Sequence, residues 1–419
     1  MKKDSKKLKN KKNKKSEKKI NKKAVLTTVI IVAVCLLVGL GIGFGIAGIK
    51  KAQRDKYLNI AFYEMEPKQI QSIQDEITSL VGEEEIKISF TVLDESDFNI
   101  KKLSSKYDLI FGWDGKCMNL LAQKAREIPE IYYEFLPTPL RKTESKKLPI
   151  MMDHYGLEYN TSAVSSALGY APESLDDFLN YVGKMKEEYF SPFIVQGADD
   201  DILLSFITCL IECFGGIECY NSFIAEYEKN PDFEKLLDFK MTASKNDDFS
   251  LRDILDMLKN WSDEGYIYPN WYKATSSDLD YFMSQDFVSS LFNSLSVHRL
   301  MNYNNITKYS GNRFVVMSND IMHGLVAPCV CVVNLRDGPF NNKIMNYLVT
   351  DDVQGRISTI TKLAPVGSYA KAWDIQSDNV RFWSASCAAG AIPSFYTALF
   401  TTKGEANAFA EQIRTYLRK

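Results

Sequence analysis

The chain has 419 residues, 45% of them hydrophobic and 12% aromatic, which is enough apolar material for more than one ordinary globular domain. Its formal net charge is −2, but residues 1 to 23 carry 13 Lys against Asp4 and Glu17, which leaves about −13 on the remainder. So acidic a remainder excludes a nucleic-acid binder, and we expect no nucleic acid among its partners.

The N-terminus has the composition of a membrane anchor. The lysine-rich tail, residues 1 to 23, is followed by an uncharged apolar segment, residues 24 to 49, that is long enough to cross about 30 Å of hydrocarbon as a helix. Positive residues stay on the cytoplasmic side. The pattern predicts a single-pass protein of the cell membrane with a cytoplasmic N-terminus, a linker at 50 to 57, and an extracellular or periplasmic remainder.

This segment has two alternative interpretations. A cleaved secretory signal has a shorter apolar core, of roughly 7 to 15 residues, and a small-x-small exit that is absent here. A lipid-modified Cys35 is disfavoured because Val34 precedes it and an apolar run follows it. Cleavage stays open as an alternative.

Cysteine and histidine spacing predicts no metal site and no cofactor. No Cys-x-x-Cys pair occurs, and His154, His298 and His323 lie far apart in the sequence. Seven cysteines follow the apolar segment. We expect them to be small buried hydrophobic residues, with one or two disulfides as the alternative.

After the linker, strand-like and helix-like stretches alternate, which is typical of a parallel sheet covered by helices. Residues 58 to 63, 85 to 93 and 108 to 111 read as strands, while residues 67 to 81 and 96 to 105 read as helices. Together they predict a βαβαβ unit. Because ligands of such units bind at the carboxyl ends of the strands, Glu64, Trp113 and Asp114 become candidate binding residues. Trp113 could equally close the edge of the sheet.

The next stretches predict a connection and a second region. Residues 148 to 160 begin with Leu-Pro and read as one extended segment. This pattern indicates a strand that crosses between two lobes. Ser174 precedes Asp176 and Asp177, the pattern of a capped helix that continues to about residue 188.

Four stretches resemble the extracellular solute-binding proteins of ABC importers, the family that includes maltose and other sugar binders. They are residues 148 to 160, residues 169 to 178 with Leu175 where tryptophan is usual, residues 282 to 290, and residues 344 to 366. The third is similar to a Phe-x-x-Gly helix start of that family, with Gln285 in place of the glycine.

The resemblance implies an α/β, bilobed, type II periplasmic-binding-protein-like fold with a hinge and an interlobe cleft. Lobe 1 would comprise residues 58–151 and 322–364, and lobe 2 residues 152–321 and 365–419. The resemblance also implies ligand contacts by Glu64, Trp113, Asp114, Asp153 and Tyr155, and a stacking role for Tyr396.

Two further candidates come from loops. Asp199 lies in an acidic loop, residues 197 to 201, that follows a predicted strand; its charges belong either to a cleft or to the first turn of a helix, and we favour the helix for Asp200 and Asp201. Asn293 could donate and accept hydrogen bonds at a strand end.

The predicted function is capture of a small solute, most simply a sugar or oligosaccharide, and its delivery to an ABC transporter permease. Few arginines or lysines occur around the candidate residues, which favours a neutral polyhydroxyl or cationic solute over an anionic one. The sequence has no catalytic signature, so we expect no enzyme, although Asp114 and Asp153 could form the acid pair of a glycosidase. A bilobed sensor or interaction module at the membrane is the alternative.

Overall fold

The computed structural model describes residues 56 to 82, 84, 86 to 242, 248 to 372 and 374 to 419. Its first sheet has six strands in the order β13-β4-β12-β3-β1-β2. Their bounds are β1 Tyr57–Tyr63, β2 Lys87–Leu93, β3 Leu109–Trp113, β4 Leu148–Met152, β12 Cys329–Asn334 and β13 Ala364–Pro365. Strand β1 runs parallel to β2 and β3, so the predicted βαβαβ unit is confirmed. Strands β4 and β12 complete the sheet in antiparallel pairing.

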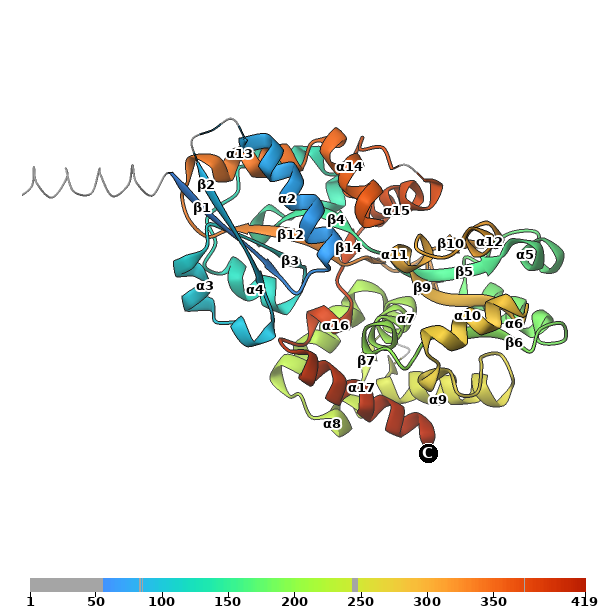
Figure 1. Cartoon of the computed structure of the whole chain (residues 1–419). Helices are drawn as coiled ribbons and strands as arrows, with labels where there is room; N and C mark the ends of the chain where they lie inside the picture. The colour runs from blue at the N-terminus through green and yellow to red at the C-terminus, as the bar shows by residue number, and fades with distance from the viewer. Residues whose placement is uncertain (1–55, 83, 85, 243–247, 373) are drawn as a thin grey trace, which may run out of the picture. The chain divides into compact units, whose positions relative to one another are not determined.

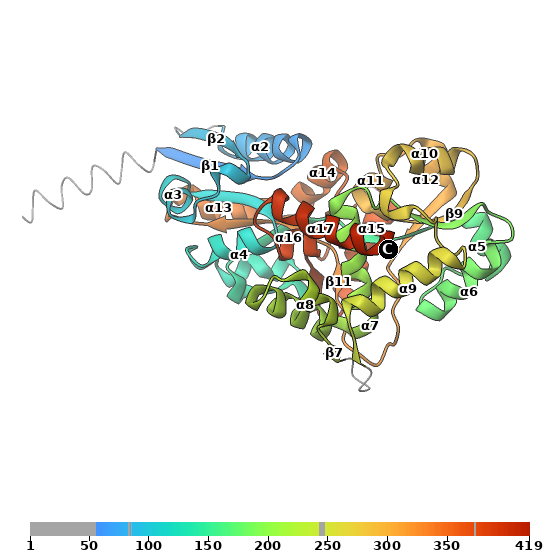
Figure 2. The ribbon, with the colours of Figure 1, turned by 90° about the horizontal axis from the view of Figure 1, so that it is seen from below.

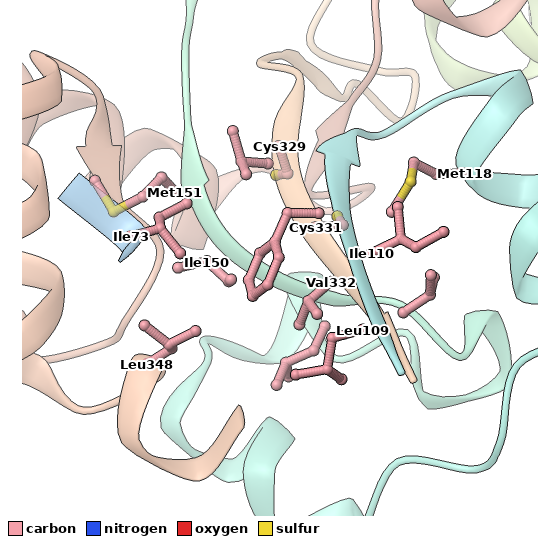
Figure 3. Packing of buried hydrophobic residues seen from close by; sticks show 14 of the residues in the cluster. Ile73, Leu109, Ile110, Met118, Ile150, Met151, Cys329, Cys331, Val332 and Leu348 are labelled. Atoms are coloured by element: carbon pink, nitrogen blue, oxygen red, sulfur yellow. The ribbon is translucent and has the colours of Figure 1, made fainter. Parts of the chain in front are cut away.

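Helices cover both faces of the first sheet (Figure 1). They are α2 Pro67–Val81, α13 Pro339–Leu348 and α14 Asp351–Thr361 on one face, and α3 Ile100–Lys106 and α4 Lys116–Ala122 on the other. Helix α2 begins as predicted at Pro67, behind a capping box formed by Glu66 and Gln69. Figure 3 shows Ile73 of α2 on one side of the strands and Met118 of α4 on the other side. The strands are therefore buried on both faces, which explains their nearly continuous apolar sequences.

The second sheet has four strands in the order β10-β5-β9-β6. They are β5 Tyr155–Asn160, β6 Ser191–Val195, β9 Val288–Ser294 and β10 Tyr309–Asn312. Successive side chains of β6 alternate between two hydrophobic clusters: Phe193 and Val195 pack in the cluster that includes α7, and Ile194 packs in the cluster that includes α10. This sheet is thus covered on both faces as well.

Of the remaining helices, α15 Ile375–Ser386 packs on β13 at the edge of the first sheet, and the others surround the second sheet and the C-terminal segment. These others are α5 Thr161–Ala167, α6 Leu175–Met185, α7 Asp200–Lys229, α8 Phe233–Asp238, α9 Leu251–Asp263, α10 Ser276–Ser284, α11 Leu295–His298, α12 Tyr303–Lys308, α16 Phe395–Ala398 and α17 Lys403–Arg418. Helix α6 begins after the predicted N-cap Ser174, whose side chain accepts a hydrogen bond from the Asp177 amide. In Figure 2 the short α16 lies near α4, and it contacts α7 as well. The C-terminal segment therefore packs against elements of both sheets.

Helix α7 is the central helix of the second region. It is long and apolar enough by composition to span a membrane, but 83% of its most apolar window is buried within the protein, as expected of a core helix. Gly216 interrupts it with φ 61°, and a side chain there would lie 2.4 Å from the Met322 carbonyl oxygen. Glycine is therefore required at this break. The predicted transmembrane segment, residues 24 to 49, lies outside the described residues.

The chain passes between the two sheets at three places. Strand β4 belongs to the first sheet and β5 to the second, with only Asp153 and His154 between them, so the predicted crossing at 148 to 160 is confirmed. The other two crossings, β11 Leu325–Val326 and β14 Ala391–Ile392, pair in parallel with each other.

Two expectations differ from the structure. Residues 282 to 290 do not start a helix: Phe282 lies in the last turn of α10, and β9 begins at Val288. Residues 365 to 391 were expected with lobe 2, yet Val366, Val380 and Cys387 belong to the core of the first sheet. The physical reason is that the crossing back to the second sheet comes at β14, after α15, rather than at β13.

The seven cysteines among the described residues are buried and free, as the sequence favoured over disulfides. Cys329 and Cys331 lie on β12 within the core of the first sheet (Figure 3). Within the described ranges, His, Cys, Asp and Glu side chains form no group of three that could hold a metal ion.

Candidate functional site

A cleft with a volume of about 1190 Å³ lies where loops from the two sheets face each other. On the first-sheet side it is lined by the residues that follow β1, β2 and β3. On the other side it is lined by the start of β5, the loop from β6 into α7, the end of β9, and the first turn of α17. Carboxyl ends of strands and helix N-termini meet here, which is where α/β folds bind ligands.

Glu64 directly follows β1 and has φ 50°, a left-handed backbone conformation that is uncommon for a residue with a side chain. Its carboxylate accepts a hydrogen bond from the Glu95 amide at 2.9 Å and forms an ion pair with Lys403 at 2.6 Å. The Lys403 amide in turn donates to the Glu95 carboxylate at 2.6 Å. Because Lys403 begins α17, this network connects the first-sheet loops to the helix that packs on α7.

Asp153 and Tyr155 lie on the crossing between β4 and β5. The Asp153 carboxylate accepts hydrogen bonds from the His154 and Ser296 amides at 2.8 and 3.0 Å and from the Ser296 hydroxyl at 2.5 Å. Burial nevertheless raises the pKa of Asp153, against the effect of these donors. Both residues line the cleft.

The acidic loop before α7 also lines the cleft, but its roles differ in part from those expected. Asp199 is the side-chain cap, accepting from the Ile202 amide at 3.0 Å, while Asp200 and Asp201 occupy the first turn. Asp201 accepts hydrogen bonds from the Tyr155 hydroxyl at 2.7 Å and from Ser205 at 3.2 Å. Desolvation, and then the negative charges of Asp199 and Asp153, raise the pKa of Asp201 to about 7.

Aromatic side chains provide the apolar part of the cleft. Trp113 at the end of β3 and Tyr396 in α16 line it and are half-buried, and Phe400, which also lines it, is buried. Burial and the nearby carboxylates Asp201 and Asp199 raise the pKa of Tyr396, so its hydroxyl stays protonated. Flat rings beside hydrogen-bonding carboxylates suit a ligand that has both apolar faces and hydroxyl or amine groups.

Two of the predicted residues do not line this cleft. Asp114 forms an ion pair with Lys147, whose ammonium also donates to Asn119. Burial alone would lower the pKa of Lys147, but Asp114 raises it, and the net shift is upward. Asn293 lines a separate cavity of about 20 Å³, and its side-chain oxygen accepts from the Ser294 amide at 2.9 Å. The pair of Asp114 and Asp153 that a glycosidase would need is therefore not assembled in the cleft.

Sequence reasoning missed several lining residues. Glu95 follows β2, and the rule that selected residues after β1 and β3 would have found it had β2 been included. Asp201 was assigned only to the helix. Lys403 and Asn407 carry no local signal, because their position depends on how α17 packs. Of the eight predicted residues, Glu64, Trp113, Asp153, Tyr155, Asp199 and Tyr396 line one cleft, and their contact with a ligand stays a prediction.

No protein-family model and no curated protein sequence matches this chain. Solved structures match its fold. The bacterial solute receptor AcbH, described as having an exclusive preference for β-D-galactopyranose, has a TM-score of 0.70 at 12% identity, covering 87% of this chain and 92% of its own. A putative binding protein of Bacillus subtilis in an open conformation has a TM-score of 0.64 at 13% identity, covering 87% and 93%.

A third match is a sugar transporter protein of Bacillus licheniformis in complex with stachyose, with a TM-score of 0.55 at 13% identity, covering 86% of this chain and 98% of its own. At these identities the comparisons show the fold. The chain has the α/β fold of the extracellular solute-binding proteins, as the sequence resemblance implied. Those three structures are of solute-binding or sugar-transport proteins, none of them described as an enzyme.

Proposed function

We propose that this protein captures a sugar or oligosaccharide in the cleft between two lobes and delivers it to the permease of an ABC transporter. The observation that carries the proposal is the cleft of about 1190 Å³, which Trp113 and Tyr396 line together with the carboxylates of Asp153 and Asp199. Aromatic faces pack against sugar rings, and carboxylates accept hydrogen bonds from hydroxyl groups. The solved structures with this fold support a sugar, since their descriptions name galactopyranose and stachyose.

Capture would work by closure of the lobes about the three crossing segments. A ligand that contacts both sides of the cleft favours the closed state by the affinity it gains there beyond the open state. Closure would bury the solute and change the outer surface offered to the permease. Residues 24 to 49 would hold the protein at the outside of the membrane while the tail, residues 1 to 23, stays in the cytoplasm.

The first test is a thermal unfolding screen of the full chain in detergent against galactose, stachyose, maltooligosaccharides and chitin oligosaccharides. A ligand at one hundred times its Kd stabilises the folded form by about 2.7 kcal/mol and raises its melting temperature. Trp113→Ala should abolish the shift. Tyr369→Ala is the matched control, because Tyr369 is 83% exposed and does not line the cleft. If no sugar shifts the melting temperature, the proposal of sugar capture is wrong.

Delivery and topology need separate tests. Cells that lack this chain should lose uptake of the solute found in the screen and regain it with the wild-type chain but not with Trp113→Ala. Protease added to intact cells or spheroplasts should digest the part after residue 50. Normal uptake without the chain, or full protection from protease, would contradict the proposed role and topology respectively.

A further inference from the structure

The cleft has an excess of negative charge that the protein itself leaves uncompensated. Seven carboxylates and two lysines are among its lining residues. Some of the carboxylates have cationic partners: Glu64 pairs with Lys403, and Asp200 pairs with Arg414. Throughout the described part of the chain, no lysine or arginine forms an ion pair with Asp153, Asp199 or Asp201.

The partners of these three carboxylates are neutral. Asp153 accepts from backbone amides and Ser296, Asp199 from the Ile202 amide, and Asp201 from Tyr155 and Ser205. The N-terminus of α7 supplies only about half a positive charge. Arg299 acts on Asp153 at longer range, but its guanidinium is already paired with Asp374 at 2.5 Å.

The repulsion among these carboxylates affects the pKa of Asp201. The groups that face Asp201 are Tyr155 on β5, Ser205 on α7, and the carboxylates of Asp199 and Asp153, with the Tyr396 hydroxyl near them. Burial and those two carboxylates raise the pKa of Asp201 to about 7. A cation bound among the three carboxylates would remove this repulsion and favour the ionised form of Asp201.

A second, independent feature lies in the same cleft. Ser394 is fully buried, lines the cleft, and its hydroxyl has no hydrogen-bond partner among the described residues. A buried hydroxyl without a partner is unfavourable by about 1 to 3 kcal/mol, so a ligand that hydrogen-bonds to it gains affinity. Tyr155 and Tyr396 add ring faces that attract cations as well as sugar rings.

We propose that the solute is a positively charged sugar, of the amino-sugar class, whose ammonium group binds among Asp153, Asp199 and Asp201. This inference rests on the proposed function, since it specifies the ligand of the same cleft. The ring of the sugar would pack on the aromatic side chains, and its ammonium would supply the positive charge that the protein lacks at this point. Neutral sugars of the same size would bind more weakly.

The test compares glucosamine oligomers, whose free amines carry positive charge, with N-acetylglucosamine oligomers of equal length, whose acetylated amines are neutral. Isothermal titration calorimetry of the full chain in detergent should give at least tenfold tighter binding of the glucosamine oligomer at pH 7. Galactose and maltooligosaccharides measure neutral binding.

Asp201→Asn should reduce the preference for the amine about tenfold. It should fold without loss of stability, because the carboxylate that it replaces is repelled by its neighbours; thermal unfolding at pH 7 checks this. Asp176→Asn is the matched control, since Asp176 is an exposed aspartate in the first turn of α6 and does not line the cleft. It should leave the preference unchanged.

The outcomes separate the two proposals. Tighter binding of a neutral sugar than of the amine overturns the charged-sugar inference and leaves sugar capture intact. An amine preference that survives Asp201→Asn also overturns the inference. Binding of no member of the panel overturns sugar capture itself, and the inference with it.

Discussion

His154 should make the protein sensitive to acid. It lies on the crossing between β4 and β5, is 4% exposed, and packs against Trp383 with ring centroids 5.4 Å apart. Desolvation, helped by the positive charge of Arg313, lowers its pKa to about 3. The folded protein therefore holds a neutral imidazole at pH values where an unfolded chain would bind a proton.

The direction and size of the effect follow from linkage. Because the folded pKa is depressed below the unfolded value of about 6.5, this contribution to stability is present above pH 6.5 and is lost as the pH falls toward 3. pH 5 lies about 1.5 units below the pKa of an unfolded histidine. At about 1.4 kcal/mol per unit, protonation of His154 in the unfolded state therefore stabilises that state by about 2 kcal/mol. His154→Phe removes the titration and keeps a ring against Trp383.

Urea unfolding of both proteins at pH 8, 7 and 5, followed by tryptophan fluorescence, measures this contribution. The difference in unfolding free energy between wild type and His154→Phe should be the same at pH 8 and pH 7. At pH 5 it should move by about 2 kcal/mol in favour of the variant, while all other titrating groups cancel in the comparison. A difference that stays constant within about 0.5 kcal/mol from pH 8 to pH 5 would show that His154 is not held neutral.

Three further predictions concern packing, thiols and the cleft network. Gly197→Ala should destabilise the protein by about 1 to 3 kcal/mol in urea unfolding, because the added Cβ would lie 2.6 Å from the Tyr272 Cα. The control is Gly183→Ala in α6, which should be neutral or stabilising, because its Cβ would meet only Tyr266 at 3.9 Å. Equal effects of the two substitutions would refute the argument. Iodoacetamide should label none of the described cysteines in the native protein, because they are buried and burial raises the pKa values of their thiols. In urea it should label all of them, as measured by mass spectrometry. Rapid labelling of the native protein would contradict this prediction. Glu64→Gln should lower the unfolding free energy by less than about 1 kcal/mol, because its partner Lys403 is 66% exposed, and a loss of several kcal/mol would mean that the pair is effectively buried.

Much of the fold could be predicted because its signals are local. The strands β1 and β3 are short apolar runs, β2 alternates as an edge strand, and Pro67 and Ser174 occupy the helix starts that their chemistry favours. The crossing at β4 and β5 was visible as one long extended segment. In contrast, residues 282 to 290 carry apolar side chains at spacings that fit a helix end and a buried strand equally, and only pairing of β9 with β5 and β6 decides between them.

The cleft was predicted less completely for a related reason. The rule that ligands bind at the carboxyl ends of strands depends on topology and selected Glu64 and Trp113 correctly as lining residues. It could not show that Asp114, the next residue after Trp113, turns away to Lys147, since the two are 33 residues apart in the chain. Lys403 reaches the cleft only through the packing of the last helix.

The arrangement of Asp153 suggests why binding and closure would be coupled without a long path between them. Asp153 lies between β4 of the first sheet and β5 of the second, and its carboxylate accepts hydrogen bonds from Ser296 of α11, the helix that follows β9. One cleft-lining side chain therefore fixes the relative position of two segments at the crossing. A ligand that binds this carboxylate, or changes its charge, acts on the crossing itself. A ligand bound at the crossing would contact segments that connect both sheets. If its binding free energy were about 1 to 2 kcal/mol more favourable in the closed form than in the open form, the ratio of closed to open molecules would rise about tenfold.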